Sequence, residues 1–152
     1  MNQKQSLLFI SGVSLAVLAG AFAFQLAGYL PCHLCYIGRW AHYAAIPLGV
    51  IFALVPGLRR AGLFILAAVF LGNTVFSIWH SGIEWQWWAG PSTCTGGGGL
   101  SGVVPDFGNL NVVQCDEPAI RILALSLAGW NAVISAALAA FAIRQGSSSV
   151  SQ

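Results

Sequence analysis

Long apolar stretches, separated by short polar breaks, make up most of the chain. A helix that crosses a bilayer needs about 20 mainly apolar residues. Four stretches meet or approach this length, at residues 7–30, 37–55, 61–79 and 119–143. Small residues recur in all of them, and small residues let helix backbones approach closely in lipid. The pattern predicts an all-α membrane protein built as a four-helix transmembrane bundle.

The composition agrees with this prediction. Hydrophobic residues make up 57% of the 152 residues and charged residues only 7%, whereas soluble domains carry about 25% charged residues. A soluble core cannot bury so much apolar surface, so we expect a lipid bilayer around a single domain, 1–152. The net charge of +2 is too small to suggest nucleic acid as a partner.

The positions of the basic residues predict the orientation. Four of the six fall on one side of the predicted bundle: Lys4, Arg59, Arg60 and Arg144. The positive-inside rule makes that side cytoplasmic. Both termini then face the cytoplasm, while a short loop at 31–38 and a long loop at 80–118 face outward. A cleaved secretory signal ending near Ala21–Ala23 is an alternative, but the apolar run continues past that point.

All four cysteines, Cys32, Cys35, Cys94 and Cys115, fall in the outward loops. Outer compartments are oxidising, so disulfides persist there. Four cysteines allow three pairings, of which Cys32–Cys35 with Cys94–Cys115 is the simplest. A disulfide across two intervening residues stabilises a fold little, but Cys-x-x-Cys pairs often have a lowered thiol pKa and exchange readily. This pair is therefore predicted to be redox-active.

The neighbouring residues fit a reactive dithiol. Arg39 lies one helical turn beyond Cys35, and His33 lies between the two cysteines, so either positive charge can favour a thiolate. The second pair encloses the run Gly96–Gly99, which suits either a disulfide that staples a loop or a mobile exchange site.

Two other interpretations remain open at this stage. A zinc site is one, with two cysteine pairs as ligands and histidines as substitutes. Cys94 and Cys115 are 21 positions apart and form no second tight knuckle, so we expect no metal. A purely structural protein is the other, but the tight first pair is a poor staple.

A dithiol needs an electron acceptor. The chain has no Gly-rich dinucleotide fingerprint and no haem-type C-x-x-C-H, because Tyr36 follows Cys35. A quinone held between helices at the bilayer boundary meets the requirement.

The stretch "PCHLCYIGR" at 31–39 resembles the first periplasmic loop of the DsbB family of disulfide-generating quinone reductases, with its pattern P-C-x-L-C-x-x-x-R. The resemblance covers nearly the whole chain, including "GPSTC", "CDEPA" and "LSLAGWN". It implies a multi-pass protein of the bacterial inner membrane with periplasmic cysteines. It also implies a protein-dithiol:quinone oxidoreductase that uses ubiquinone or menaquinone and reoxidises a periplasmic DsbA-like protein of thioredoxin fold.

The resemblance also implies a role for each cysteine. Cys35 is the thiolate beside the quinone, and Cys32 is its more exposed disulfide partner. Cys94 is attacked by the reduced DsbA-like protein, which gives a mixed disulfide. Cys115 is the leaving thiol that passes electrons to Cys32, and a transient Cys32–Cys115 bridge is compatible with this order.

Arg39 and His80 match family positions beside the quinone. The sequence departs from the usual pattern at Gly38, where an acidic residue often precedes the arginine, and in a shorter, glycine-rich second loop. The vitamin K epoxide reductase family shares a four-helix bundle with Cys-x-x-Cys chemistry, but its active pair usually follows a different helix order.

Several other residues are expected to have ordinary roles. Trp85, Trp87 and Trp88 favour the headgroup level of the membrane and are predicted anchors. His42 is expected to be a polar packing residue, and Asn131 to bond between helices. Glu84 is expected to be a solvated acid, with a proton carrier for quinone reduction as the alternative.

Overall fold

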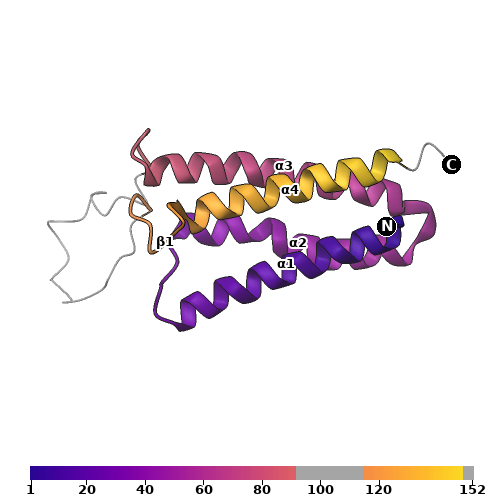
Figure 1. The fold of residues 1–152 in the computed structure, drawn as a ribbon, viewed down its shortest axis with the longest axis horizontal. Coiled ribbons are helices and arrows are strands. Elements are labelled where there is room, and N and C mark those ends of the chain that lie inside the picture. The colour runs from indigo at the N-terminus through magenta and orange to yellow at the C-terminus, as the bar shows by residue number, and fades with distance from the viewer. Residues whose placement is uncertain (92–114, 149–152) are drawn as a thin grey trace, which may run out of the picture.

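The computed structural model describes residues 1–91 and 115–148, which form a bundle of four long helices and one small hairpin (Figure 1). The elements are α1 (Gln3–Leu26), α2 (His33–Leu54), the 3₁₀ turn η1 (Pro56–Leu58), α3 (Arg59–Glu84), β1 (Arg121–Ile122), β2 (Leu125–Ser126) and α4 (Leu127–Ser148). All four α-helices are long and apolar enough to cross a membrane. The predicted all-α membrane bundle is confirmed.

The helices lie side by side in two pairs, with α1 along α2 and α3 along α4 (Figure 1). The N-terminus, η1 and the last turn of α4 lie at one end of the bundle. The α1–α2 turn, the end of α3 and the hairpin lie at the other (Figure 1). We call the latter the cysteine end, because it holds Cys32, Cys35 and Cys115. Which compartment it faces stays a prediction.

The turn between α1 and α2 places the first cysteine. Gly28 has a φ of 97°, a conformation that glycine adopts without strain, and it reverses the chain after Leu26. The backbone is then extended at Cys32, which is the N-cap residue of α2. The loop therefore ends with a cysteine at the first turn of a membrane helix.

Close backbone approach joins α1 to α2. The Ser11 hydroxyl donates across the interface to the carbonyl oxygens of Ala45 (3.3 Å) and Ile46 (3.2 Å). A methyl group on Gly49 would meet the Ser11 hydroxyl and lie 2.9 Å from the Leu7 carbonyl oxygen. The interface thus depends on a small residue, as expected for helices that pack in lipid.

α2 begins at His33, inside the predicted loop 31–38, because Cys32 caps it there. The observed helix limits also differ from the predicted spans at three further points. First, α1 covers Gln3–Leu26, four residues earlier than predicted at each end, and a capping box between the Asn2 side chain and Gln5 fixes its start. Second, α3 continues through residues 80–84, which were predicted to lie in a loop.

Third, α4 begins at Leu127 instead of 119. The preceding residues form a hairpin in which Arg121 pairs with Ser126 and Ile122 with Leu125. Its two turn residues, Leu123 and Ala124, have φ of 51° and 69°. Positive φ at both positions matches the twist of a tight two-residue hairpin. Apolar composition alone hid this turn, because neither residue is a usual turn former.

The predicted tryptophan anchors lie just beyond α3. Trp85, Trp87 and Trp88 are exposed, as an interfacial position requires. The Trp88 indole donates to the Trp79 carbonyl oxygen at 2.9 Å, and its ring packs on Gly82. The segment therefore folds back over the last turns of α3, while its role as a membrane anchor stays a prediction.

We expect Gly49→Ala to lower the free energy of unfolding by about 1–3 kcal/mol, because the added methyl group overpacks the α1–α2 interface. Gly72→Ala is the matched control, since it lies in a helix with open space around it and gains the same helix propensity. Thermal unfolding in detergent measures both. Equal midpoints for the two variants would contradict the packing argument.

Candidate functional site

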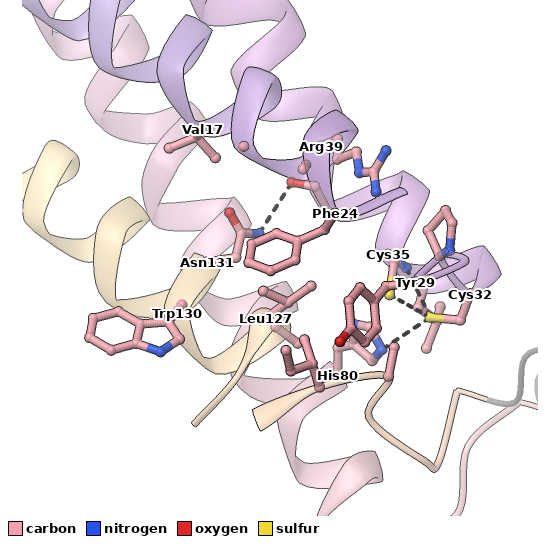
Figure 2. Close-up of a pocket in the computed structure, with 18 of the residues that line it drawn as sticks. Val17, Phe24, Tyr29, Cys32, Cys35, Arg39, His80, Leu127, Trp130 and Asn131 are labelled. Carbon is pink, nitrogen blue, oxygen red and sulfur yellow. Dashed lines mark hydrogen bonds between the residues drawn. The ribbon is translucent and has the colours of Figure 1, made fainter. Parts of the chain in front are cut away.

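A cavity of about 220 Å³ opens at the cysteine end (Figure 2). Its walls come from all four helices, with His80 and Glu84 contributed by α3, and most of its surface is apolar. Figure 2 shows Phe24, Tyr29 and Leu127 gathered between the two sulfur atoms and Asn131. A narrow apolar space that is bounded by a thiol pair suits a flat organic molecule that reacts with thiols.

Cys32 is held as the cap of α2. Its Sγ accepts a hydrogen bond from the Cys35 backbone N–H at 3.2 Å, and the two Sγ atoms lie 2.7 Å apart. Both cysteines are free thiols in this structure, with Cys32 buried and Cys35 half-buried. The expectation that Cys32 is the more exposed of the two was wrong, because Cys32 packs in a buried cluster with Leu34, Ile83 and Cys115. A helix N-terminus stabilises negative charge, so the local fold favours a thiolate at Cys32. The predicted Cys32–Cys35 disulfide stays a prediction.

His80 approaches Cys32 from α3. Its Nε2 atom lies 3.6 Å from Cys32 Sγ, and the ring is buried. The hydrogen bond with the Cys35 thiol holds the pKa of the Cys32 thiol well below its usual value, against the opposing effect of burial. The hydrogen bond and charge of His80 lower that pKa further. These contacts favour negative charge on Cys32 in the reduced pair, while the role of Cys35 as the thiolate beside the quinone stays a prediction.

The two residues that the sequence suggested as thiolate stabilisers lie elsewhere. His33 is exposed on the first turn of α2. The Arg39 guanidinium donates to Gln25 Oε1 at 3.3 Å and lies over the Tyr36 ring at 5.2 Å. Gln25 is a site residue that sequence reasoning missed. It anchors the arginine at the edge of the cavity that both α1 and α2 line.

The thiol pair and His80 also form a potential metal-ligating group, because their ligand atoms lie within 4.8 Å of one another. In a tetrahedral zinc site with Zn–S of about 2.3 Å, two sulfur ligands lie about 3.8 Å apart. The Cys32 and Cys35 sulfurs are much closer, at 2.7 Å. This spacing suits thiols that share a proton or form a disulfide better than two zinc ligands.

Glu84 is a second residue whose place the sequence did not reveal. The expectation of a solvated acid was wrong, because its side chain is only 7% exposed and lines the cavity. It bonds to Ser126, while its Oε2 atom has no hydrogen-bond partner among the described residues. Glu84 follows His80 by four residues, so both lie on one face of α3. This four-residue spacing was the sequence signal that could have placed Glu84 on the same helix face as His80.

A polar network lies deeper between the helices. Asn131 on α4 donates from Nδ2 to the Gly38 carbonyl oxygen at 3.2 Å and to Ser77 Oγ at 2.8 Å. Its Oδ1 atom lies 2.9 Å from His42 Nε2. The His42 ring also packs against Phe70, with 5.3 Å between ring centroids. Asn131 thus bonds between helices, as expected.

The second cysteine pair is only partly described. Cys94 lies outside the described residues. Cys115 is disulfide-bonded and buried, and it belongs to the same cluster as Cys32, Leu34 and Ile83. The fold therefore brings a cysteine of the second pair close to the first pair, although 80 residues separate Cys115 from Cys35 in the sequence.

We expect His80→Ala to raise the pKa of the Cys32 thiol, because the variant loses a hydrogen bond and a positive charge that favour the thiolate. The midpoint should move upward by about one pH unit. The thiolate absorbance of the reduced protein, followed against pH, measures it. His33→Ala is the control and should leave the midpoint in place. A larger effect of His33→Ala would overturn the assignment.

Comparison with known proteins agrees with this geometry. The family model of disulfide bond formation protein DsbB matches residues 3–145. The chain is also similar to the uncharacterized protein RP370 of Rickettsia prowazekii (strain Madrid E), with 23% identity over 136 residues that cover 85% of this chain and 79% of that protein. No solved structure matches the chain. Because the family match spans nearly the whole chain, this multi-pass membrane protein belongs to the DsbB family of disulfide-forming thiol oxidoreductases.

Proposed function

We propose that the protein is a protein-dithiol:quinone oxidoreductase. It reoxidises a periplasmic DsbA-like protein and passes two electrons to ubiquinone or menaquinone in the bacterial inner membrane. The observation that carries the proposal is the cavity, in which a reactive thiol pair faces an apolar space between membrane helices. The orientation proposed with it puts the cysteine end in the periplasm and both termini in the cytoplasm.

The lining of the cavity fits a quinone. The rings of Phe24, Tyr29 and Trp130 offer flat contact surfaces, and polar groups stand only at particular points. Those points include the thiols, His80 and Glu84 at the cysteine end, Arg39 at the side, and His42 with Asn131 further in. A site of this kind holds the apolar body of a ligand and orients its few polar atoms. A quinone supplies the two-electron acceptor that the dithiol requires.

Electrons would enter through the second cysteine pair. A thiolate of the reduced partner attacks Cys94, forms a mixed disulfide and releases Cys115. The partner's second thiol then attacks the partner's own sulfur in that mixed disulfide, so the partner is released with a disulfide and Cys94 becomes a thiolate. The Cys115 thiolate attacks Cys32, because Cys32 and Cys115 share one buried cluster, and Cys35 leaves as a thiolate. Finally Cys94 attacks Cys115, which restores the Cys94–Cys115 disulfide and leaves Cys32 and Cys35 as the dithiol that reduces the quinone.

This order of steps is compatible with a thiolate at Cys32 in one state of the pair and at Cys35 in another. In the fully reduced pair, the hydrogen bonds of Cys35 and His80 place the negative charge on Cys32. While Cys32 is engaged with Cys115, the released thiolate is Cys35, which lines the cavity. Overall, one dithiol and one quinone give one disulfide and one quinol, so two electrons and two protons are transferred and no other reactant is needed.

Arg39 would orient the ring and stabilise negative charge on a ring oxygen. Its guanidinium is already fixed by Gln25 and stacked against Tyr36 and Phe22, so little side-chain freedom is lost on binding. Glu84, with one unpartnered carboxylate oxygen beside the thiols, is placed to exchange the protons that the thiols release.

The direct test is quinone reduction by the purified protein in detergent with a reduced DsbA-like protein, followed by the quinone absorbance. We expect turnover that Cys35→Ser abolishes, since this change removes one thiol of the pair. Cys94→Ala should stop partner oxidation while quinone binding is retained. A folded wild-type protein without turnover, or normal turnover in Cys94→Ala, would contradict the proposed electron path.

We expect Arg39→Ala to raise the KM for quinone about tenfold, because a hydrogen bond from a charged group contributes about 1.5–3 kcal/mol. Gln25→Ala should have a smaller effect in the same direction, since Arg39 remains but is held less firmly. Arg60→Ala, at the opposite end of the bundle, is the control. Steady-state kinetics with a short-chain quinone measures all three, and an unchanged KM in Arg39→Ala excludes the assigned role.

A further inference from the structure

A second pocket lies at the end of the bundle opposite the cysteines. Its volume of about 540 Å³ is within the range of ligand sites in proteins. In contrast to the cavity at the cysteine end, its wall is mostly polar. We call it the basic pocket. The start of α1, the start of α3 and the end of α4 form it (Figure 1), and its lining includes Asn2, Gln3, Lys4, Arg59, Gln145 and Ser148.

The basic pocket lies at the level of the lipid headgroups. All four helices are long and apolar enough to cross a membrane, and the pocket is formed where three of them begin or end. Beyond the hydrocarbon core, such helix ends lie among the headgroups. A molecule in the pocket therefore meets the polar surface of the membrane.

Lys4 and Arg59 give the pocket a positive charge that the described part of the chain does not neutralise. The acidic residues that the structure describes, Glu84, Asp116 and Glu117, all lie at the cysteine end. Neither cation therefore has an ion-pair partner among residues 1–91 and 115–148. Two such cations on the wall of one pocket attract an anionic group.

Arg59 is already held in a position that suits a phosphate. Its Nε donates to the Ala53 carbonyl oxygen at 3.1 Å, and the side chain is half-buried. The terminal N–H groups of a guanidinium match two phosphate oxygens at once. Lys4 is exposed, so its flexible ammonium group can move to the same anion.

The surface next to the pocket favours a lipid over a free phosphate ion. Leu8 follows Lys4 by one helical turn on the same face of α1, and its side chain is exposed. Ile143, near the end of α4, is exposed as well. A lipid whose phosphate occupies the pocket can lay its acyl chains on such apolar side chains, whereas a free ion gains nothing from them.

The basic pocket also lies between the two helix pairs of the bundle. Lys4 belongs to α1, which packs along α2, and Arg59 begins α3, which packs along α4. An anion that binds both side chains therefore connects the two pairs. At the other end, Asn131 makes a comparable connection between α4 and α2.

We propose that the basic pocket binds the phosphate of an anionic glycerophospholipid through Arg59 and Lys4. The bound lipid holds the two helix pairs together at the end that lacks the cysteines. This binding is independent of quinone reduction and takes place at the opposite end of the bundle from the thiols.

Thermal unfolding of the full-length protein in a neutral detergent tests the proposal, because a ligand that binds only the folded state raises the unfolding midpoint. We expect added phosphatidylglycerol to raise the midpoint until the site is saturated. Phosphatidylcholine and sodium phosphate should have little effect. Lys4→Gln and Arg59→Gln should each weaken the affinity for phosphatidylglycerol about fivefold. Arg144→Gln is the control, since it removes one charge at the same end outside the pocket lining and should leave the affinity unchanged.

The other outcomes overturn the proposal in different ways. Equal losses of affinity in Lys4→Gln and Arg144→Gln would show diffuse attraction between charges and no site. Equal stabilisation by phosphatidylcholine would contradict selection for an anionic lipid, and equal stabilisation by sodium phosphate would identify a free ion as the ligand. If Arg59→Gln does not fold, Lys4→Gln decides, because its side chain is exposed. A failure of quinone turnover contradicts the proposed function and leaves this inference in place.

Discussion

The first turn of α2 is the constraint on which the site depends. Cys32 caps the helix by accepting the Cys35 backbone N–H at its sulfur, so the same contact starts the helix, joins the two thiols and exposes Cys32 to the positive end of the helix dipole. A cysteine is a poor cap by structural standards, because serine, threonine and aspartate bind the exposed N–H groups better. Its presence at this position makes sense if the charge on sulfur matters more than the stability of the helix end.

The rest of the site follows from the direction of α2. Once the helix starts at Cys32, its period places Cys35, Arg39 and His42 successively along one face. The neighbouring helices then supply one partner at each level: His80 beside the thiols, Gln25 beside the arginine and Asn131 beside His42. At each of these three levels, the polar group of α2 is thus held by a group from another helix. This satisfies part of its hydrogen-bonding capacity and also fixes its orientation toward the cavity.

The sequence was informative where local chemistry decides the structure. Helix-length apolar runs predicted the bundle, and the spacing of Cys32 and Cys35 predicted a reactive dithiol. It was uninformative where contacts between distant segments decide. The pairing of Gln25 with Arg39 joins two helices at 14 positions' separation, and no motif marks it. The burial of Glu84 depends on α3 continuing past the predicted end of the span and on Ser126 packing against it. The hairpin at 121–126 also escaped prediction, because Leu123 and Ala124 rarely adopt positive φ.

The polar network around Asn131 explains how an apolar cavity can persist inside a small bundle. Packed interiors leave few voids, and small residues such as Gly49 draw α1 and α2 together elsewhere in the bundle. Near the cysteine end, Asn131 connects α2 through Gly38 and His42 and α3 through Ser77. The lengths of these hydrogen bonds set the spacing between α4 and the other two helices. Side chains therefore do not have to fill the cavity to keep the helices at that distance. The same asparagine that connects these helices also holds the His42 ring through Nε2, so the polar network inside the bundle depends on one side chain.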